Sequence, residues 1–144
     1  MRVVPTALAT ELIQRLLEMD TPVWMRVYGD SMSPTLRSGD RVAIAPATGR
    51  EPRPGDVVAV RVSDGMMVHR LVERRRDGAV LTAGDAVNQC DAPVSAEDVI
   101  GVVVEVERDG RYRALDNRTA TRWRLETRRV WPALKQTCRR FLPL

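Results

Sequence analysis

The stretch "VYGDSMSPTLRSGD", residues 27–40, places Ser31 among turn-forming residues and ends in the pair Gly39-Asp40. Gly, Asp, Ser and Pro are the residues that separate strands, so one interpretation is a polar loop between two strands. The second interpretation is a loop that holds Ser31 at the end of a strand as a nucleophile. Both interpretations predict strands on either side of the stretch.

The sequence around this stretch alternates strand-like runs with turn residues. The runs are "WMRVY", "RVAIA", "DVVAVRV", "MMVHRLVE", "AVLTA", "DVIGVVVEVE" and "RYRAL". Compact Asp-Gly turns favour antiparallel neighbours, and no helices alternate with the strands. With only one Phe, two Tyr and three Trp in 144 residues, the core depends on Val, Leu, Ile and Ala, which suits a sheet. We therefore predict a mainly β domain, a coiled antiparallel sheet, over residues 23–116.

Two amphipathic segments flank this domain. In residues 1–22, apolar residues recur at helical spacing and predict one helix that starts after Thr6 as N-cap and ends near residues 20–22. The apolar positions are Leu8, Leu12, Ile13, Leu16 and Leu17. In residues 117–144, apolar residues at spacings of three, four and seven alternate with arginines. This pattern predicts a basic amphipathic helix, or two helices that meet at Pro132.

The charge of the chain is unevenly distributed. The formal net charge is +4, yet residues 1–116 carry a net charge of −3 and residues 117–144 a net charge of +7. An anionic partner is therefore expected at the basic tail. The alternatives, in order of preference, are docking on the domain or on a partner protein, peripheral contact with an anionic membrane, and nucleic acid.

The cysteines and the apolar runs restrict the class of protein. Cys90 and Cys138 lie far apart in no metal-binding pattern, and the chain has one His, so we expect no metal or other cofactor. We also expect two free thiols and a reducing compartment. The longest apolar run, residues 99–104, is too short to span a membrane, and the first residues lack the apolar core of a signal peptide. A cytoplasmic protein is expected, with peripheral membrane attachment as the alternative.

Ser31 becomes a nucleophile only if a base removes its proton. The single His, His69, lies 38 residues later in "MMVHRLVE", whereas the single Lys, Lys135, lies in the tail. A carboxylate to orient the imidazole could come from Asp85 or Asp91 in "LTAGDAVNQCDAPV". Each of these residues also has an ordinary role, as a turn former or as a structural His. Spacing alone does not decide between the two readings.

Several segments together resemble one family. "GDSMSPTLRSGD" is similar to the nucleophile box of the signal peptidase I clan, which includes the self-cleaving SOS repressor peptidases. "RPGDVVAV" resembles the next strand, "MMVHRLVE" the strand of the base, and "TAGDAVNQCDAPV" with "VIGVVV" the Gly-Asp box and the closing strand. The resemblance covers roughly residues 25–107 in the family's order. It implies the coiled antiparallel β fold of that clan.

The resemblance also assigns roles. It implies Ser31 as nucleophile and His69 as general base, where the bacterial leader peptidases and SOS repressors have Lys and the endoplasmic-reticulum and archaeal type has His. It implies Asp91 as the residue that orients His69, and Asp85 as the box residue that shapes the catalytic site. The backbone N–H of Ser31 is the expected oxyanion donor. The expected substrate-binding residues of the nucleophile box are Gly29, Asp30, Met32 and Pro34.

The activity implied by the resemblance is that of a serine endopeptidase. It would cleave an extended peptide or precursor protein through an acyl-enzyme, with the substrate paired to a strand edge. Signal peptidases normally carry at least one membrane-spanning segment, and no such anchor is expected in this chain. The alternative is a non-catalytic or self-processing regulatory module that binds peptides, with "ALA" at Ala7–Ala9 as a superficially suitable cleavage signal.

Overall fold

The computed structural model describes residues 1–3, 7–47 and 51–115, and their fold is mainly β. These residues form one α-helix, a short 3₁₀ helix and nine strands. In chain order the elements are β1 (Arg2–Val3), α1 (Ala7–Glu18), β2 (Val23–Arg26), β3 (Arg41–Pro46), β4 (Val57–Val62), β5 (Gly65–Arg74), β6 (Ala79–Ala83), β7 (Val94–Ser95), the 3₁₀ helix (Ala96–Asp98), β8 (Val99–Arg108) and β9 (Arg111–Ala114). The predicted mainly β fold class is confirmed.

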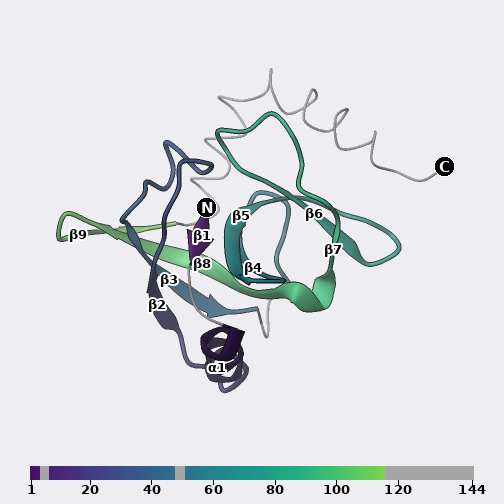
Figure 1. The fold of residues 1–144 in the computed structure, drawn as a ribbon, viewed down its shortest axis with the longest axis horizontal. Helices are drawn as coiled ribbons and strands as arrows, with labels where there is room; N and C mark the ends of the chain where they lie inside the picture. The colour runs from purple at the N-terminus through teal and green to yellow at the C-terminus, as the bar shows by residue number, and fades with distance from the viewer. Residues whose placement is uncertain (4–6, 48–50, 116–144) are drawn as a thin grey trace.

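All of these strands belong to one antiparallel sheet. Its order is β2-β3-β8-β4-β5-β6-β7, with β1 paired to β5 and β9 paired to β8. The β3–β8, β4–β8 and β5–β6 pairs each contain a register shift, and such bulges bend strands and increase their twist. Figure 1 shows the N-terminus and β1 near the middle of the view, beside β5, with α1 at the bottom. The start of the chain thus lies against the strand that carries the only His.

The predicted strands correspond to β2 to β6, β8 and β9. The two strands that the sequence did not indicate, β1 and β7, have two residues each, which is too short for an alternating pattern. The glycine in "VIGVVV" permits a close approach of β8 to β3. A Cβ on Gly101 would lie 2.5 Å from Cγ2 of Ile44 and 2.7 Å from the carbonyl oxygen of Ala45.

Helix α1 packs on the sheet through a narrower face than the sequence indicated. Ile13 and Leu17 are buried in the main core, but Leu8 is 77% exposed and Leu12 is 59% exposed. Leu8 and Leu12, two of the apolar positions that predicted the helix, thus lie outside its packed face, because helical spacing alone does not fix where the packed face ends. After the helix, Asp20 adopts a left-handed conformation with φ of 59°, which ends it close to the predicted place.

The prediction of two free thiols is also wrong. Cys90 is buried and disulfide-bonded, and the chain has one other cysteine, Cys138, which lies outside the described residues. Disulfides persist in oxidising environments, so the argument for a reducing compartment no longer holds.

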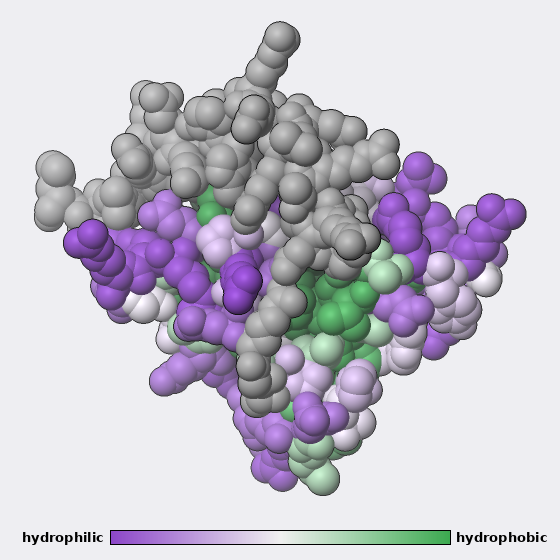
Figure 2. All heavy atoms as spheres, turned by 180° about the vertical axis from the view of Figure 1, so that it is seen from behind, coloured by the Kyte–Doolittle hydropathy of each residue, from purple (hydrophilic) through white to green (hydrophobic). Residues whose placement is uncertain are grey.

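The surface of the described residues is mixed in polarity. Seen from behind, Figure 2 shows hydrophobic side chains gathered in one area, bordered by hydrophilic ones. Among the residues that the structure describes, no helix has the length and apolar character to cross a membrane. The predicted basic tail, residues 117–144, lies outside this part of the chain. Its docking, its membrane contact and the cellular location therefore stay predictions.

A partly buried ion pair closes the loop that follows β2. Nε and Nη2 of Arg108 donate to the carboxylate of Asp40 over 2.9 and 2.6 Å, and the backbone N–H of Arg37 donates over 2.8 Å. Burial opposes ionisation of Asp40, but these hydrogen bonds outweigh it and hold the pKa of Asp40 below its usual value of 3.8. The same contact raises the pKa of Arg108.

This pair gives an expected acid dependence of stability. Because the pKa of Asp40 is lower in the folded state, its ionised carboxylate stabilises the fold at any pH above its pKa in the unfolded chain. This stabilisation is lost as the pH falls through its pKa in the folded state. We expect the free energy of unfolding of the wild type to fall more steeply between about pH 5 and about pH 2 than that of Asp40→Asn. Urea unfolding measures this, with the exposed Asp20→Asn as control. Parallel curves for the wild type and Asp40→Asn would contradict the assignment.

Candidate active site

Ser31 lies in the loop between β2 and β3, and local contacts fix the shape of this loop. The N–H of Val27 donates to the carbonyl of Asp40 over 2.9 Å, and the N–H of Gly39 donates back to Val27 over 2.8 Å. The side chains of Met32 and Leu36 are fully buried and anchor the loop in the core. Ser31 itself is half-buried, at the inner side of the loop.

The segment after β6 supports the serine from the other side. The N–H of Ala86 donates to the carbonyl oxygen of Ser31 over 2.9 Å. A Cβ on Gly84 would lie only 2.5 Å from that oxygen and 3.0 Å from Cβ of Ser31. Only glycine at position 84 therefore permits this close approach of the two loops, which places Gly84 among the residues that position the nucleophile.

His69 connects the serine to a carboxylate. Its imidazole comes from β5 and is 6% exposed. Nε2 lies 2.9 Å from Oγ of Ser31, and Nδ1 lies 2.5 Å from Oδ2 of Asp91. An ionised carboxylate only accepts hydrogen bonds, so the proton is on Nδ1 and the lone pair of Nε2 faces the serine. This is the protonation that a general base for Ser31 requires.

Asp91 is itself held in place by β6. The hydroxyl of Thr82, which is fully buried, donates to Oδ2 of Asp91 over 2.7 Å. The N–H of Asp91 donates to the carbonyl of Thr82 over 2.8 Å. These two bonds fix both the backbone and the side chain of Asp91, whose carboxylate contacts His69.

Asp85 lies in a different network. Its carboxylate accepts two hydrogen bonds of 2.7 Å from Nε and Nη2 of Arg70, and one of 2.6 Å from the hydroxyl of Thr35. The side chains of Arg70 and Asp85 are 2% and 1% exposed. Within the described part of the chain, no hydrogen bond joins Asp85 to His69. The structure thus places Asp91 against the imidazole, and Asp85 in an ion pair that joins β5 to the nucleophile loop.

The other residues expected to bind substrate lie on the same loop with different exposure. Gly29, Asp30 and Pro34 are exposed. The side chain of Met32 is fully buried and offers no surface to a ligand in this structure. Gly29 has φ of 100°, a conformation that favours glycine, and its N–H donates to Oγ of Ser38 over 3.2 Å.

Arg70 and Thr82 are among the residues of the site that the sequence did not single out. Arg70 had a signal, because a charged residue in the middle of the mostly apolar run "MMVHRLVE" requires a buried partner. Thr82 had none, since threonine is ordinary in a strand. In the described residues, His, Cys, Asp and Glu side chains form no group of three that could hold a metal ion.

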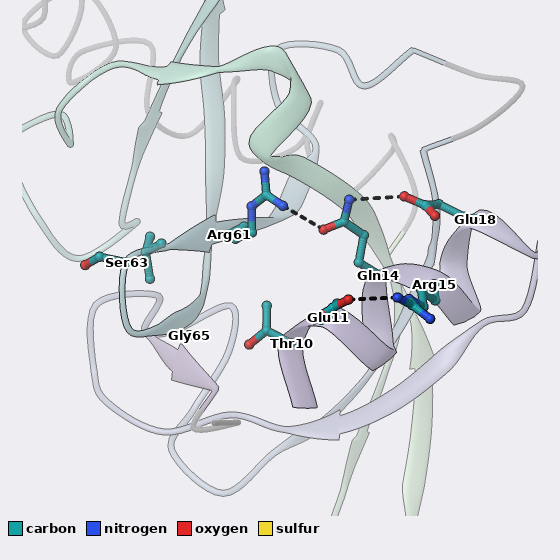
Figure 3. Close-up of a pocket in the computed structure, with 9 residues that line it drawn as sticks. Thr10, Glu11, Gln14, Arg15, Glu18, Arg61, Ser63 and Gly65 are labelled. Carbon is teal, nitrogen blue, oxygen red and sulfur yellow. Dashed lines mark hydrogen bonds and ion pairs between the residues drawn. The ribbon is translucent and has the colours of Figure 1, made fainter. Parts of the chain in front are cut away.

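A pocket of about 500 Å³ lies elsewhere, between α1 and the β4–β5 turn (Figure 3). Its polar groups contact one another: Arg15 donates to the carboxylate of Glu11 over 2.9 Å, and Arg61 donates to the amide oxygen of Gln14 over 2.9 Å. Ser31, His69 and Asp91 are not among its lining residues. The candidate active site therefore rests on the contacts of these three side chains and not on the presence of a pocket.

The close approach at Gly84 gives a testable expectation. Gly84→Ala should displace Ser31 from Nε2 of His69 and lower any Ser31-dependent activity by about a hundredfold, because small misplacements of a reacting group are that costly. The control is Gly78→Ala, in a turn where an added Cβ meets open space and only local backbone strain results. Equal losses of activity in Gly84→Ala and Gly78→Ala would contradict the proposed contact.

Comparison with known proteins identifies the family of the chain. A search among curated proteins gave no match to this chain. The model of the Peptidase S24-like family matches residues 8–104, which include Ser31, His69 and Asp91 and most of the sheet. Since this match covers more than half of the sequence, the chain belongs to the Peptidase S24-like family.

Proposed function

We propose that the protein is a serine endopeptidase in which Ser31 is the nucleophile and His69 the general base. The observation that carries this proposal is the continuous chain of contacts from Oγ of Ser31 through both nitrogens of His69 to Asp91. A nucleophile, a base and an orienting carboxylate in this order are the parts that acyl transfer requires. The family is one of serine peptidases and related regulatory domains, which is consistent with the proposal.

The proposed reaction has two steps. Nε2 of His69 takes the proton of Ser31 while Oγ attacks the scissile carbonyl, and the protonated imidazole then gives this proton to the leaving amine. Water, activated by His69, hydrolyses the acyl-enzyme and frees Ser31. Asp91 stabilises the imidazolium that exists between these transfers.

The oxyanion donor is proposed to be the backbone N–H of Ser31. Among the described residues, no acceptor is hydrogen-bonded to this N–H, so it is open to a developing negative charge. A backbone donor of this kind typically contributes about 3–4 kcal/mol to the transition state. Gly29, two positions before Ser31, has no side chain that could add a hydroxyl.

The proposed substrate is an extended peptide or a precursor protein, cleaved without a need for lipid. The alternative, a non-catalytic or self-processing regulatory module, has less support. Ala7–Ala9 forms the first turn of α1, so this signal would have to unwind before it could enter the site as a strand.

The test is cleavage of a mixed library of soluble peptides, read by mass spectrometry. Wild type, Ser31→Ala and His69→Ala are compared with Ser63→Ala, an exposed serine of the β4–β5 turn. We expect cleavage by the wild type and by Ser63→Ala, and none by the other two variants. Cleavage that survives Ser31→Ala, or requires added membranes, would contradict this proposal.

A further inference from the structure

The strand that carries His69 has an edge that leads directly to the candidate active site. Residues 65–70 of β5 pair with β4 on one side, and residues 70–74 pair with β6 on the other side. On this second side, the edge of residues 65–68 is therefore not covered by β6. Such an edge accepts an extended peptide through main-chain hydrogen bonds, as in strand addition.

The first residues of this chain occupy that edge. Arg2 pairs with Met67 and Val3 with Met66 in the antiparallel strand β1. The N–H of Val68 donates to the carbonyl of Met1 over 3.0 Å. Figure 1 shows β1 running beside β5. A strand of two residues makes few hydrogen bonds, so a competing peptide can displace it.

The amino group of Met1 contacts the two reacting atoms of the site, Oγ of Ser31 and Nε2 of His69. It is hydrogen-bonded to Oγ of Ser31 and lies 3.1 Å from Nε2 of His69. Nε2 has a single lone pair, since Nδ1 carries the proton toward Asp91. An ammonium that donates to Nε2 uses the lone pair that must accept the proton of Ser31. The contact therefore blocks the base as well as the space for a substrate.

The position of Met1 is also that of a product. When a peptide bond is cleaved, the new amino group leaves from a point beside the serine and the imidazole. The side chain of Met1 is 6% exposed and packs with core residues that include Met32, Met66 and Val68. The apolar site it fills accepts an unbranched side chain of this size.

We propose that residues 1–3 act as an intramolecular competitor, which occupies the edge of β5 that receives the part of a substrate following the scissile bond. This inference rests on the proposed peptidase function. Substrates must displace β1, and those with an unbranched apolar residue directly after the scissile bond fit the site that Met1 leaves. The block raises KM and leaves kcat unchanged, because a displaced β1 makes no contact with the bound substrate.

The test compares Val3→Pro with Val3→Thr in the full chain. Met1 and Val68 form a hydrogen-bonded pair of the antiparallel ladder, and such pairs recur at every second residue, so Val3 and Met66 form the next one. Proline at position 3 has no N–H and therefore removes a hydrogen bond from this pair. Threonine keeps the N–H and serves as control. We expect Val3→Pro to lower KM for a reporter peptide about tenfold at constant kcat, and Val3→Thr to leave KM unchanged. Hydrogen exchange of the Val68 amide should become faster in Val3→Pro only.

A synthetic peptide, Met-Arg-Val amide with a free amino group, provides the second arm. It should inhibit Val3→Pro competitively, and its N-acetylated form should inhibit less, because it lacks the ammonium that contacts Nε2. Faster exchange of Val68 with an unchanged KM would overturn the competitor role while leaving the peptidase proposal intact. If neither the wild type nor Val3→Pro cleaves peptides or forms a covalent adduct at Ser31, the proposed function fails and this inference with it.

Discussion

Asp91→Asn is expected to lower kcat by about 10³–10⁴-fold while the fold stays intact, because an amide cannot hold the proton on Nδ1 of His69 or stabilise the imidazolium. The measurement is kcat for a reporter peptide, with circular dichroism to establish that the variant is folded. The matched comparison is Thr82→Val, which removes one hydrogen bond to Asp91 and keeps its charge.

Thr82→Val should cost about tenfold, which corresponds to a single hydrogen bond to a charged group. This smaller loss identifies Thr82 as a positioning residue for Asp91. If Asp91→Asn retained the kcat of the wild type, Asp91 would not be the group that orients His69. The catalytic account would then have to assign another carboxylate to this role.

Asp85→Ala is expected to reduce the free energy of unfolding by about 3–5 kcal/mol, since it leaves the buried guanidinium of Arg70 without its carboxylate. It also removes the acceptor for the hydroxyl of Thr35 in the nucleophile loop. Urea denaturation measures the loss. The control is Glu51→Ala, whose carboxylate is 77% exposed and pairs with Arg74, and this variant should lose no more than about 1 kcal/mol.

A double variant separates the charge of this pair from its packing. Arg70→Met combined with Asp85→Leu removes both charges, so the destabilisation should be smaller than in Asp85→Ala. An Asp85→Ala variant as stable as Glu51→Ala would contradict the role given to the pair. The activity of Asp85→Ala should fall in proportion to its fraction of folded protein, whereas Asp91→Asn should lose activity while it stays folded.

The sequence predicted the main strands because apolar runs between turn residues require only local information. It missed β1, since pairing of Arg2 with Met67 joins residues that lie 65 positions apart and leaves no local pattern. Leu8 and Leu12, two of the apolar positions that predicted α1, are exposed. Which side of a helix meets a sheet depends on the position of the sheet, and the helix sequence does not contain that information.

The site shows the same division between local and distant information. Ser31 and His69 could be selected because the local segments around them resemble one family, whereas their spacing alone did not decide. The residues alone did not separate Asp85 from Asp91, since both lie in one polar loop, and only the resemblance assigned Asp91 to the imidazole. Their roles diverge through different partners on neighbouring strands, because Arg70 of β5 holds Asp85 whereas Thr82 of β6 directs Asp91 toward the imidazole.

The most direct test of the central claim is covalent labelling of the full chain with a fluorophosphonate, followed by peptide mapping. Oγ of Ser31 would attack phosphorus, fluoride would leave, and His69 would take the serine proton. We expect one adduct, on the peptide that contains Ser31, in the wild type and in Ser63→Ala, and no adduct in His69→Gln. Absence of an adduct at Ser31 in the wild type, or equal labelling in His69→Gln, would contradict a nucleophile activated by His69.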